Sequence, residues 1–147
     1  LRLLQEGKTD LVQGLYALCP YIAGIWPLPE NPSSTENNGI LLDLHNNQGA
    51  MAYGIEELEK KNPLAWPGLA TVEDVSGLPP VVISVNECDP LRDEGIEYAL
   101  RLLQAGVSVE LHSFPGTFHG SALLPGAAVS KRSLDEVIGV LRRRLTA

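Results

Sequence analysis

The sequence comprises 147 residues, of which 44% are hydrophobic and 20% are charged. These proportions are typical of one globular unit with a packed core, and they exclude a disordered or fibrous chain. The formal net charge of −7 argues against a nucleic-acid or anionic-membrane partner, because both bind clustered Lys and Arg.

The chain opens with the end of a predicted helix and a predicted strand. Residues 1–6 have a helical pattern that stops near Gly7, and the apolar stretch over residues 11–19 predicts a buried strand ended by Pro20. The first residue, Leu1, has no Met or helix cap before it. We therefore expect the natural start of the protein to lie upstream of this sequence.

A long insertion is expected between this strand and the next, over about residues 21–70. Turn-forming residues crowd the segment 27–39, which indicates a surface loop. The helical pattern that follows over residues 40–61 is interrupted by Gly49 and Gly54. The insertion is thus predicted to consist of a loop and a broken helix.

The second half of the chain is more regular. A β-branched run over residues 81–85 is typical of a parallel strand covered on both faces. A helix is expected over residues 93–105, followed by Gly106 as its C-terminal glycine. We expect its buried face to carry Ile96, Leu100 and Leu103, and its solvent face to carry Glu94, Glu97, Arg101 and Gln104.

The last two predicted elements are a strand and a helix. Apolar and polar residues alternate over residues 107–114, as in a strand at the edge of a sheet. The final helix has apolar residues at helical spacing, and Ser133 with Glu136 matches a capping box at its start. The order strand, helix, strand, helix predicts an α/β fold with a mostly parallel sheet and flanking helices. The longest apolar runs are too short to span a membrane.

The two cysteines, Cys19 and Cys88, are isolated from each other and follow strand-like runs. They have neither C-x-x-C spacing nor a neighbouring His in the sequence, so no metal site is predicted. We expect reduced thiols rather than a disulfide, which favours a cytoplasmic location.

Asp89 and His119 each follow a predicted strand, at its carboxyl end. In open parallel sheets functional groups gather at this edge, and strands joined by a single helix are usually neighbours. A carboxylate in contact with an imidazole can fix the tautomer of the ring and stabilise its charged form. Because an Asp after a strand and a His in a turn are most often structural, these two positions alone do not establish a function.

The segments around these residues resemble a known family. The sequence NECDPLRDEG at residues 86–95 resembles the D-P-L-x-D-E segment of the hormone-sensitive-lipase-like branch of the α/β-hydrolases, and GTFHG at residues 116–120 resembles the segment around that family's catalytic histidine. The resemblance implies that Asp89 is the acid and His119 the base of a Ser-His-Asp triad. Asp93 matches no catalytic position and is interpreted as an acid in the first turn of a helix. Further matches lie at residues 15–20, 62–65 and 77–80, and the weakest part is residues 25–47.

Two motifs of complete family members are missing from this sequence, the H-G-G-G oxyanion segment and the G-x-S-x-G nucleophile segment. Neither Ser108 nor Ser121 has the required neighbours. We therefore expect the nucleophile to lie before Leu1, the alternatives being a lost nucleophile or a mistaken family. On this interpretation, residues 1–147 are the C-terminal portion of one catalytic domain and are inactive alone, because the N-terminal half with cap, oxyanion loop and nucleophile is absent.

The resemblance implies a carboxylesterase for small to medium acyl esters that needs no metal or organic cofactor. Its expected partners are a small-molecule ester, the missing N-terminal half and a second copy bound through the strand Val107–Phe114. The alternatives are a receptor-like member that binds a ligand without hydrolysis and, more remotely, a nucleotide-binding enzyme, which would need a G-x-G-x-x-G motif that the sequence lacks.

The remaining histidines and aromatic residues give no clear site. His45 and His112 fall in polar patterns and are interpreted as surface residues. Trp26, Trp66 and Phe118 could line an acyl pocket, but packing in the core or in loops is the favoured interpretation for each. No substrate-binding residue is identified.

Overall fold

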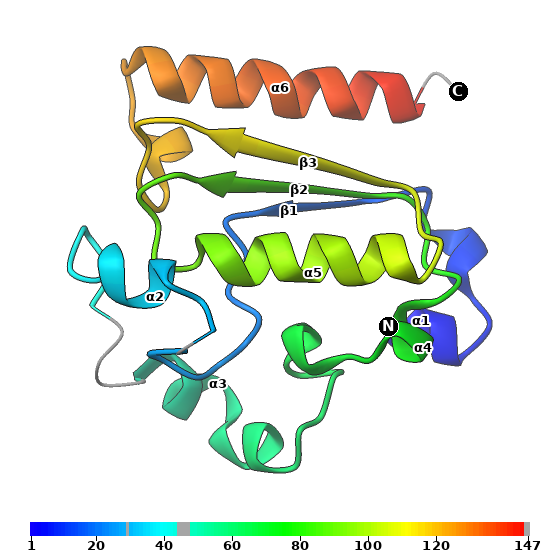
Figure 1. Ribbon diagram of the computed structural model, residues 1–147. Coiled ribbons are helices and arrows are strands. Elements are labelled where there is room, and N and C mark those ends of the chain that lie inside the picture. Colours follow the sequence, from blue (N-terminus) through cyan, green and yellow to red (C-terminus); the bar gives the residue numbers. More distant parts are fainter. Residues whose placement is uncertain (29, 44–47, 146–147) are drawn as a thin grey trace.

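The computed structural model describes residues 1–28, 30–43 and 48–145 (Figure 1). The strands are β1 (Leu15–Leu18), β2 (Val81–Asn86) and β3 (Val109–Phe114). The α-helices are α1 (Arg2–Gln5), α2 (Ser33–Glu36), α3 (Gln48–Glu59), α4 (Val72–Val75), α5 (Arg92–Gln104) and α6 (Ala128–Leu145). Short 3-10 turns are η1 (Thr9–Leu11), η2 (Pro67–Leu69) and η3 (Ser121–Leu123).

The described strands form one parallel sheet in the order β1-β2-β3. β2 is central, and all six of its residues are buried, which explains its run of β-branched residues. The predicted α/β class with a parallel sheet is therefore confirmed. The first strand is shorter than predicted, because the segment before it forms η1 and leaves Leu11 exposed.

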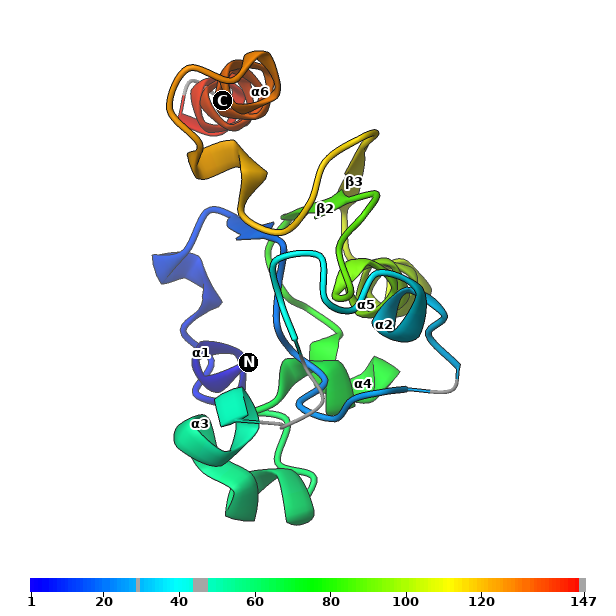
Figure 2. The ribbon, with the colours of Figure 1, turned by 90° about the vertical axis from the view of Figure 1, so that its left-hand side faces the viewer.

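Helices α5 and α6 cover opposite faces of the sheet, as the two views in Figures 1 and 2 show. Alternate β2 residues, among them Ile83 and Val85, belong to a core cluster with Ala99 and Leu102 of α5. The other face of the sheet meets α6, where Val140 is buried. Because all three described strands are parallel, their carboxyl ends lie at the same rim of the sheet, between the two helix layers.

The buried face of α5 differs from the predicted one. The helix packs on β2 through Gly95, Ala99 and Leu102, which are buried, while Leu100 and Leu103 are 52% and 54% exposed. A Cβ atom at Gly95 would lie 2.7 Å from Cγ1 of Val85, so at this point the helix lies too close to the strand for a side chain. Of the three residues predicted for the buried face, Ile96 packs against the core, whereas the prediction is wrong for Leu100 and Leu103.

Helix α6 begins at Ala128, upstream of the predicted cap. Ser133 therefore lies inside the helix, where its side chain is buried, and the predicted capping box with Glu136 is wrong. A Ser followed by a Glu at this spacing is compatible with a helix interior as well as with a helix start. The structure does not describe the side chain of Leu145, the last of the predicted apolar positions.

Between β1 and β2 the chain forms α2, α3, η2 and α4. Gly54 has a φ of 151°, and α3 is kinked there, as its glycine predicted. Trp26 and Trp66 are buried, and Tyr21 contacts both: its ring is tilted against Trp26 and edge-to-face with Trp66, with centroids 4.3 and 5.4 Å away. The favoured packing interpretation is thus confirmed for these two tryptophans. His45 lies outside the described residues.

Strand β3 is at one end of the sheet order in the described part of the chain. His112 on this strand is not a free surface residue, because it lies under α6 with 26% of its side chain exposed. Its ring nitrogens are 3.6 Å from Glu110 and 3.5 Å from Glu136 of α6. No helix among the described residues is long and apolar enough to cross a bilayer.

Candidate functional site

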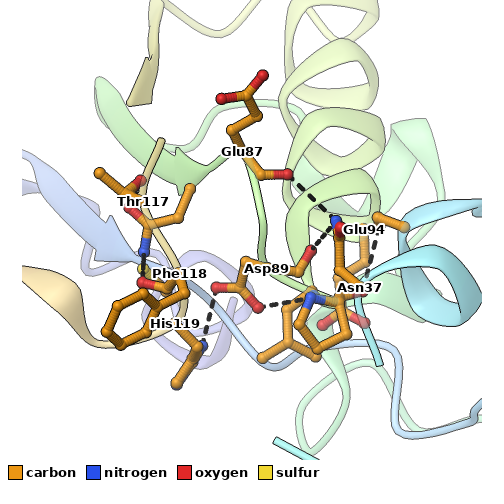
Figure 3. A network of polar contacts seen from close by, with 12 residues as sticks. Asn37, Glu87, Asp89, Glu94, Thr117, Phe118 and His119 are labelled. Carbon is orange, nitrogen blue, oxygen red and sulfur yellow. Dashed lines mark hydrogen bonds and ion pairs between the residues drawn. The ribbon is translucent and has the colours of Figure 1, made fainter. Parts of the chain in front are cut away.

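Asp89 and His119 meet at the carboxyl-end rim of the sheet. Asp89 follows β2 and His119 follows β3, and Nδ1 of His119 lies 2.9 Å from Oδ2 of Asp89 (Figure 3). The Asp89 side chain is 1% exposed, whereas 28% of the His119 side chain is exposed. The carboxylate of Asp89 is thus shielded from water, whereas the imidazole of His119 is partly accessible to it.

The Asp89 carboxylate is fixed from both sides. Its Oδ1 accepts a hydrogen bond from the Leu91 backbone N–H at 2.9 Å, which leaves Oδ2 for the imidazole. The backbone carbonyl of Asp89 accepts from Nδ2 of Asn37 at 3.3 Å. Since a carboxylate only accepts, Nδ1 of His119 carries the proton of this contact, and Nε2 of a neutral ring is then free to act as a base.

The turn that carries His119 is tied to the end of β2 by Asn86. Nδ2 of Asn86 donates to the Phe118 carbonyl at 2.8 Å, and Oδ1 of Asn86 accepts from the Thr117 hydroxyl at 2.8 Å. Asn86 and Thr117 are both 1% exposed. These buried contacts fix the position of the histidine backbone relative to the strand that carries Asp89.

Cys19 is a third member of the site that the sequence alone did not identify. It directly follows β1, has a φ of 45°, and is 7% exposed. Its Sγ accepts from Nδ2 of Asn86 at 2.8 Å. Burial raises the pKa of this thiol to about 11, with the nearby charge of Asp89 adding to the effect. The sequence did place Cys19 at the end of a predicted strand, as it did Asp89 and His119. It did not reveal that this strand lies beside β2, so the proximity of Cys19 to the pair could not be predicted.

The two acids at the start of α5 hold other segments in place. Oδ2 of Asp93 accepts from the Ser33 backbone N–H at 2.7 Å, and Oδ1 of Asp93 contacts Nε of Arg92 at 2.7 Å. Oε1 of Glu94 accepts from the Ile22 backbone N–H at 2.6 Å, although Glu94 was expected on the solvent face. Burial raises the pKa of Glu94 to about 8.

The sequence matches known proteins over most of its length. The family model described as alpha/beta hydrolase fold matches residues 1–123. The chain is 38% identical over 123 residues to carboxylesterase NlhH of Mycobacterium tuberculosis, a match that covers 79% of this chain and 38% of that protein.

Solved structures agree with the sequence matches. Esterase Est22 superposes with a TM-score of 0.92 at 61% identity, over 99% of this chain and 43% of that one. Brefeldin A esterase, described as a bacterial homologue of human hormone-sensitive lipase, superposes with a TM-score of 0.85 at 35% identity, over 97% of this chain and 42% of that one. The chain therefore spans about two fifths of the length of these relatives.

Proposed function

Since the chain belongs to the α/β-hydrolase family, in its hormone-sensitive-lipase-like branch, we propose that it supplies the acid and the base of a carboxylesterase triad. Asp89 is the acid and His119 is the base. The proposed substrates are esters with small to medium acyl groups. The nucleophilic serine and the oxyanion donors belong to a segment of the complete protein outside these 147 residues, and the greater length of the relatives supports this division.

The contact between Asp89 and His119 is the observation that carries the proposal. A buried carboxylate 2.9 Å from Nδ1 selects the tautomer in which Nε2 accepts a proton, which is the state that a general base needs. The exposed side of the imidazole faces the open rim, where a nucleophile and a substrate can approach. Ester hydrolysis is also what the names of the relatives describe.

The proposed reaction has two halves, acylation and deacylation, and each half has two proton transfers through His119. Nε2 takes the proton of the serine hydroxyl as the oxygen attacks the ester carbonyl, and the imidazolium then protonates the departing alcohol. In the second half the same nitrogen takes a proton from the water molecule that attacks the acyl-enzyme, and the imidazolium returns this proton to the serine oxygen as the acid leaves. Asp89 remains ionised throughout and stabilises the imidazolium formed in each half.

A fluorophosphonate probe tests this assignment because it reacts with activated serines. The complete protein should be labelled at one serine and should hydrolyse p-nitrophenyl acetate, whereas a protein of residues 1–147 alone should do neither. His119→Ala in the complete protein should abolish both reactions. His112→Ala is the matched control, since His112 lies under α6, and it should keep the labelling.

Two outcomes would contradict the proposal. Stoichiometric labelling of a serine within residues 1–147 would show that the nucleophile is in this chain. Tight binding of an ester ligand by the complete protein, with no turnover and no labelling, would instead support a receptor-like role.

A further inference from the structure

We infer that Cys19, Asp89 and His119 together form a binding site for a thiophilic divalent cation such as Zn²⁺, and that the bound ion inactivates the acid-base pair. The site itself depends only on the arrangement of these three side chains. Its inhibitory effect rests on the function proposed above. The sequence gives no metal signature here, because the three residues come from separate strand ends.

The three side chains offer a suitable set of ligand atoms. Sγ of Cys19, a carboxylate oxygen of Asp89 and a ring nitrogen of His119 all lie within 4.8 Å of one another. Zn²⁺ prefers S, N and O ligands at about 2.3, 2.0 and 2.0 Å, which in a tetrahedron places the ligand atoms roughly 3.3–3.5 Å apart. Nδ1 of His119 and Oδ2 of Asp89, now 2.9 Å apart, would have to separate slightly, and Sγ of Cys19 starts no more than 4.8 Å from either ligand atom. Small side-chain rotations make both adjustments, and the fourth position remains for water.

Neighbouring groups already orient the ligand atoms. Cys19 Sγ accepts from Nδ2 of Asn86, and Oδ1 of Asp89 accepts from the Leu91 N–H. Hydrogen bonds of this kind hold ligands in metal sites and strengthen binding. Cys19 and Asp89 are 7% and 1% exposed, so an ion there would be shielded, while the partly exposed His119 leaves a path of entry.

The charge balance of binding explains the inhibition. The ion replaces the thiol proton of Cys19, which is released to solvent, and bonds form from the ion to Sγ and to Nδ1 of His119. The proton on Nδ1 must move to Nε2, so that this nitrogen no longer accepts a proton. A thiolate and a carboxylate together balance the two positive charges. The metal-bound state of His119 is therefore unable to act as a base.

Cobalt absorption provides a direct test on the complete protein. Co²⁺ should bind one ion per chain and give a near-ultraviolet thiolate-to-cobalt charge-transfer band. Cys19→Ser should remove this band and weaken Zn²⁺ binding, measured by calorimetry, at least tenfold. Cys88→Ser is the matched control, because Cys88 is the other free cysteine and lies outside the cluster, and it should change neither measurement. Absence of the band, or its persistence in Cys19→Ser, would overturn the inference.

A second measurement serves if Cys19→Ser does not fold. In the unmodified protein, Zn²⁺ should slow the alkylation of Cys19 by iodoacetamide at least tenfold, as followed by peptide mass spectrometry, and should leave Cys88 unaffected. Equal rates with and without Zn²⁺ would overturn the inference.

Activity measurements separate the site from the proposed function. Zn²⁺ should inhibit p-nitrophenyl acetate hydrolysis and fluorophosphonate labelling in the wild type and in Cys88→Ser. A protein that binds Co²⁺ through Cys19 but never hydrolyses esters would refute the proposed function and keep the site. An active esterase that gives no thiolate band would refute the site alone.

Discussion

Asp89 is held at both carboxylate oxygens, and this makes it the residue whose replacement is easiest to interpret. Leu91 N–H fixes one oxygen, and the other contacts His119. The neighbouring backbone is fixed as well, by Asn37 on the Asp89 carbonyl. A substitution of the same size should therefore change the chemistry of the pair without moving its backbone.

Asp89→Asn is expected to lower kcat for ester hydrolysis in the complete protein by about 10³–10⁴-fold, because an amide cannot fix the required imidazole tautomer or stabilise its charged form. KM should change little. Steady-state kinetics with p-nitrophenyl acetate measures both constants. Asp135→Asn, at an exposed position of α6, is the control and should leave kcat unchanged. A loss smaller than tenfold in Asp89→Asn would count against the acid role.

Glu94 predicts a pH dependence of stability. Burial raises the pKa of Glu94 from 4.5 to about 8, and the charges of Asp89 and Glu97 add to this effect. Between these two pH values the folded chain keeps a proton that the unfolded chain has lost, so the free energy of unfolding decreases as pH rises from about 4.5 to 8 and then levels off.

Glu94→Gln should remove this decrease, because an amide resembles the protonated acid and can still accept from the Ile22 N–H. The variant should be similar to the wild type near pH 5. Above pH 8 it should be more stable, by an amount on the order of a few kcal/mol at most. Urea unfolding followed by circular dichroism at a series of pH values measures the difference. Parallel curves for both proteins would show that Glu94 is ionised in the folded state at neutral pH.

At the scale of elements, the contact between α5 and β2 depends on one glycine. Gly95→Ala would bring a Cβ atom within 2.7 Å of Val85 Cγ1, and overpacking of this kind costs about 1–3 kcal/mol. Gly139→Ala is a matched control inside α6, where the added Cβ meets only the end of Arg143 at 3.6 Å. Its expected effect is a gain of up to about 1 kcal/mol from helix propensity.

Thermal or urea unfolding of the complete protein compares the two variants. Because both introduce the same methyl group into a helix, the difference between them isolates the helix-strand contact. Equal stabilities would mean that α5 can move away from β2 without loss.

The elements that could be predicted from the sequence are those whose residue pattern is compatible with only one structure. The buried run over residues 81–85 predicted a strand of the parallel sheet, and the places of Asp89 and His119 after two strand ends predicted their contact. The face of α5 was predicted only in part: Ile96 packs against the core as expected, but the close approach at Gly95 puts small residues on the buried side and leaves Leu100 and Leu103 half exposed. Ser133 was misassigned because a capping motif does not exclude a helix interior. Cys19 was missed because its neighbours come from distant parts of the sequence.

At the scale of the whole molecule, η1, β1 and α6 present apolar side chains to solvent. Leu11, Leu15 and Leu18 are 70%, 42% and 36% exposed, and β1 pairs only with β2 among the described strands. Leu134, Ile138 and Leu141 of α6 are 48%, 43% and 49% exposed. An unpaired edge beside such a surface promotes association.

We therefore expect a protein of residues 1–147 alone to self-associate through this apolar surface or to precipitate. The complete protein should not associate through it. Size-exclusion chromatography with light scattering measures the mass of each. A well-folded monomer of residues 1–147 at micromolar concentration would contradict this expectation.

The other end of the sheet, at β3, gives a separate prediction. We propose that the complete protein forms a dimer through the edge of this strand. Leu111 on this strand is 43% exposed, so Leu111→Lys should convert the dimer to a monomer. Leu123→Lys, at a 74% exposed position of η3, is the control and should leave the mass unchanged. A wild-type protein that is monomeric in light scattering would remove this proposal.

The parallel sheet also has a consequence for the order of folding. β2, α5 and β3 are contiguous in the chain and form a compact unit, whereas β1 meets β2 only across all of residues 19–80. Closing that long loop costs more entropy than closing the short crossover, so we expect the contiguous unit to form first and β1 to join it later. Cys19 therefore comes beside Asp89 and His119 only in the last stage, and a thiol reagent added during refolding would capture it before the site is complete.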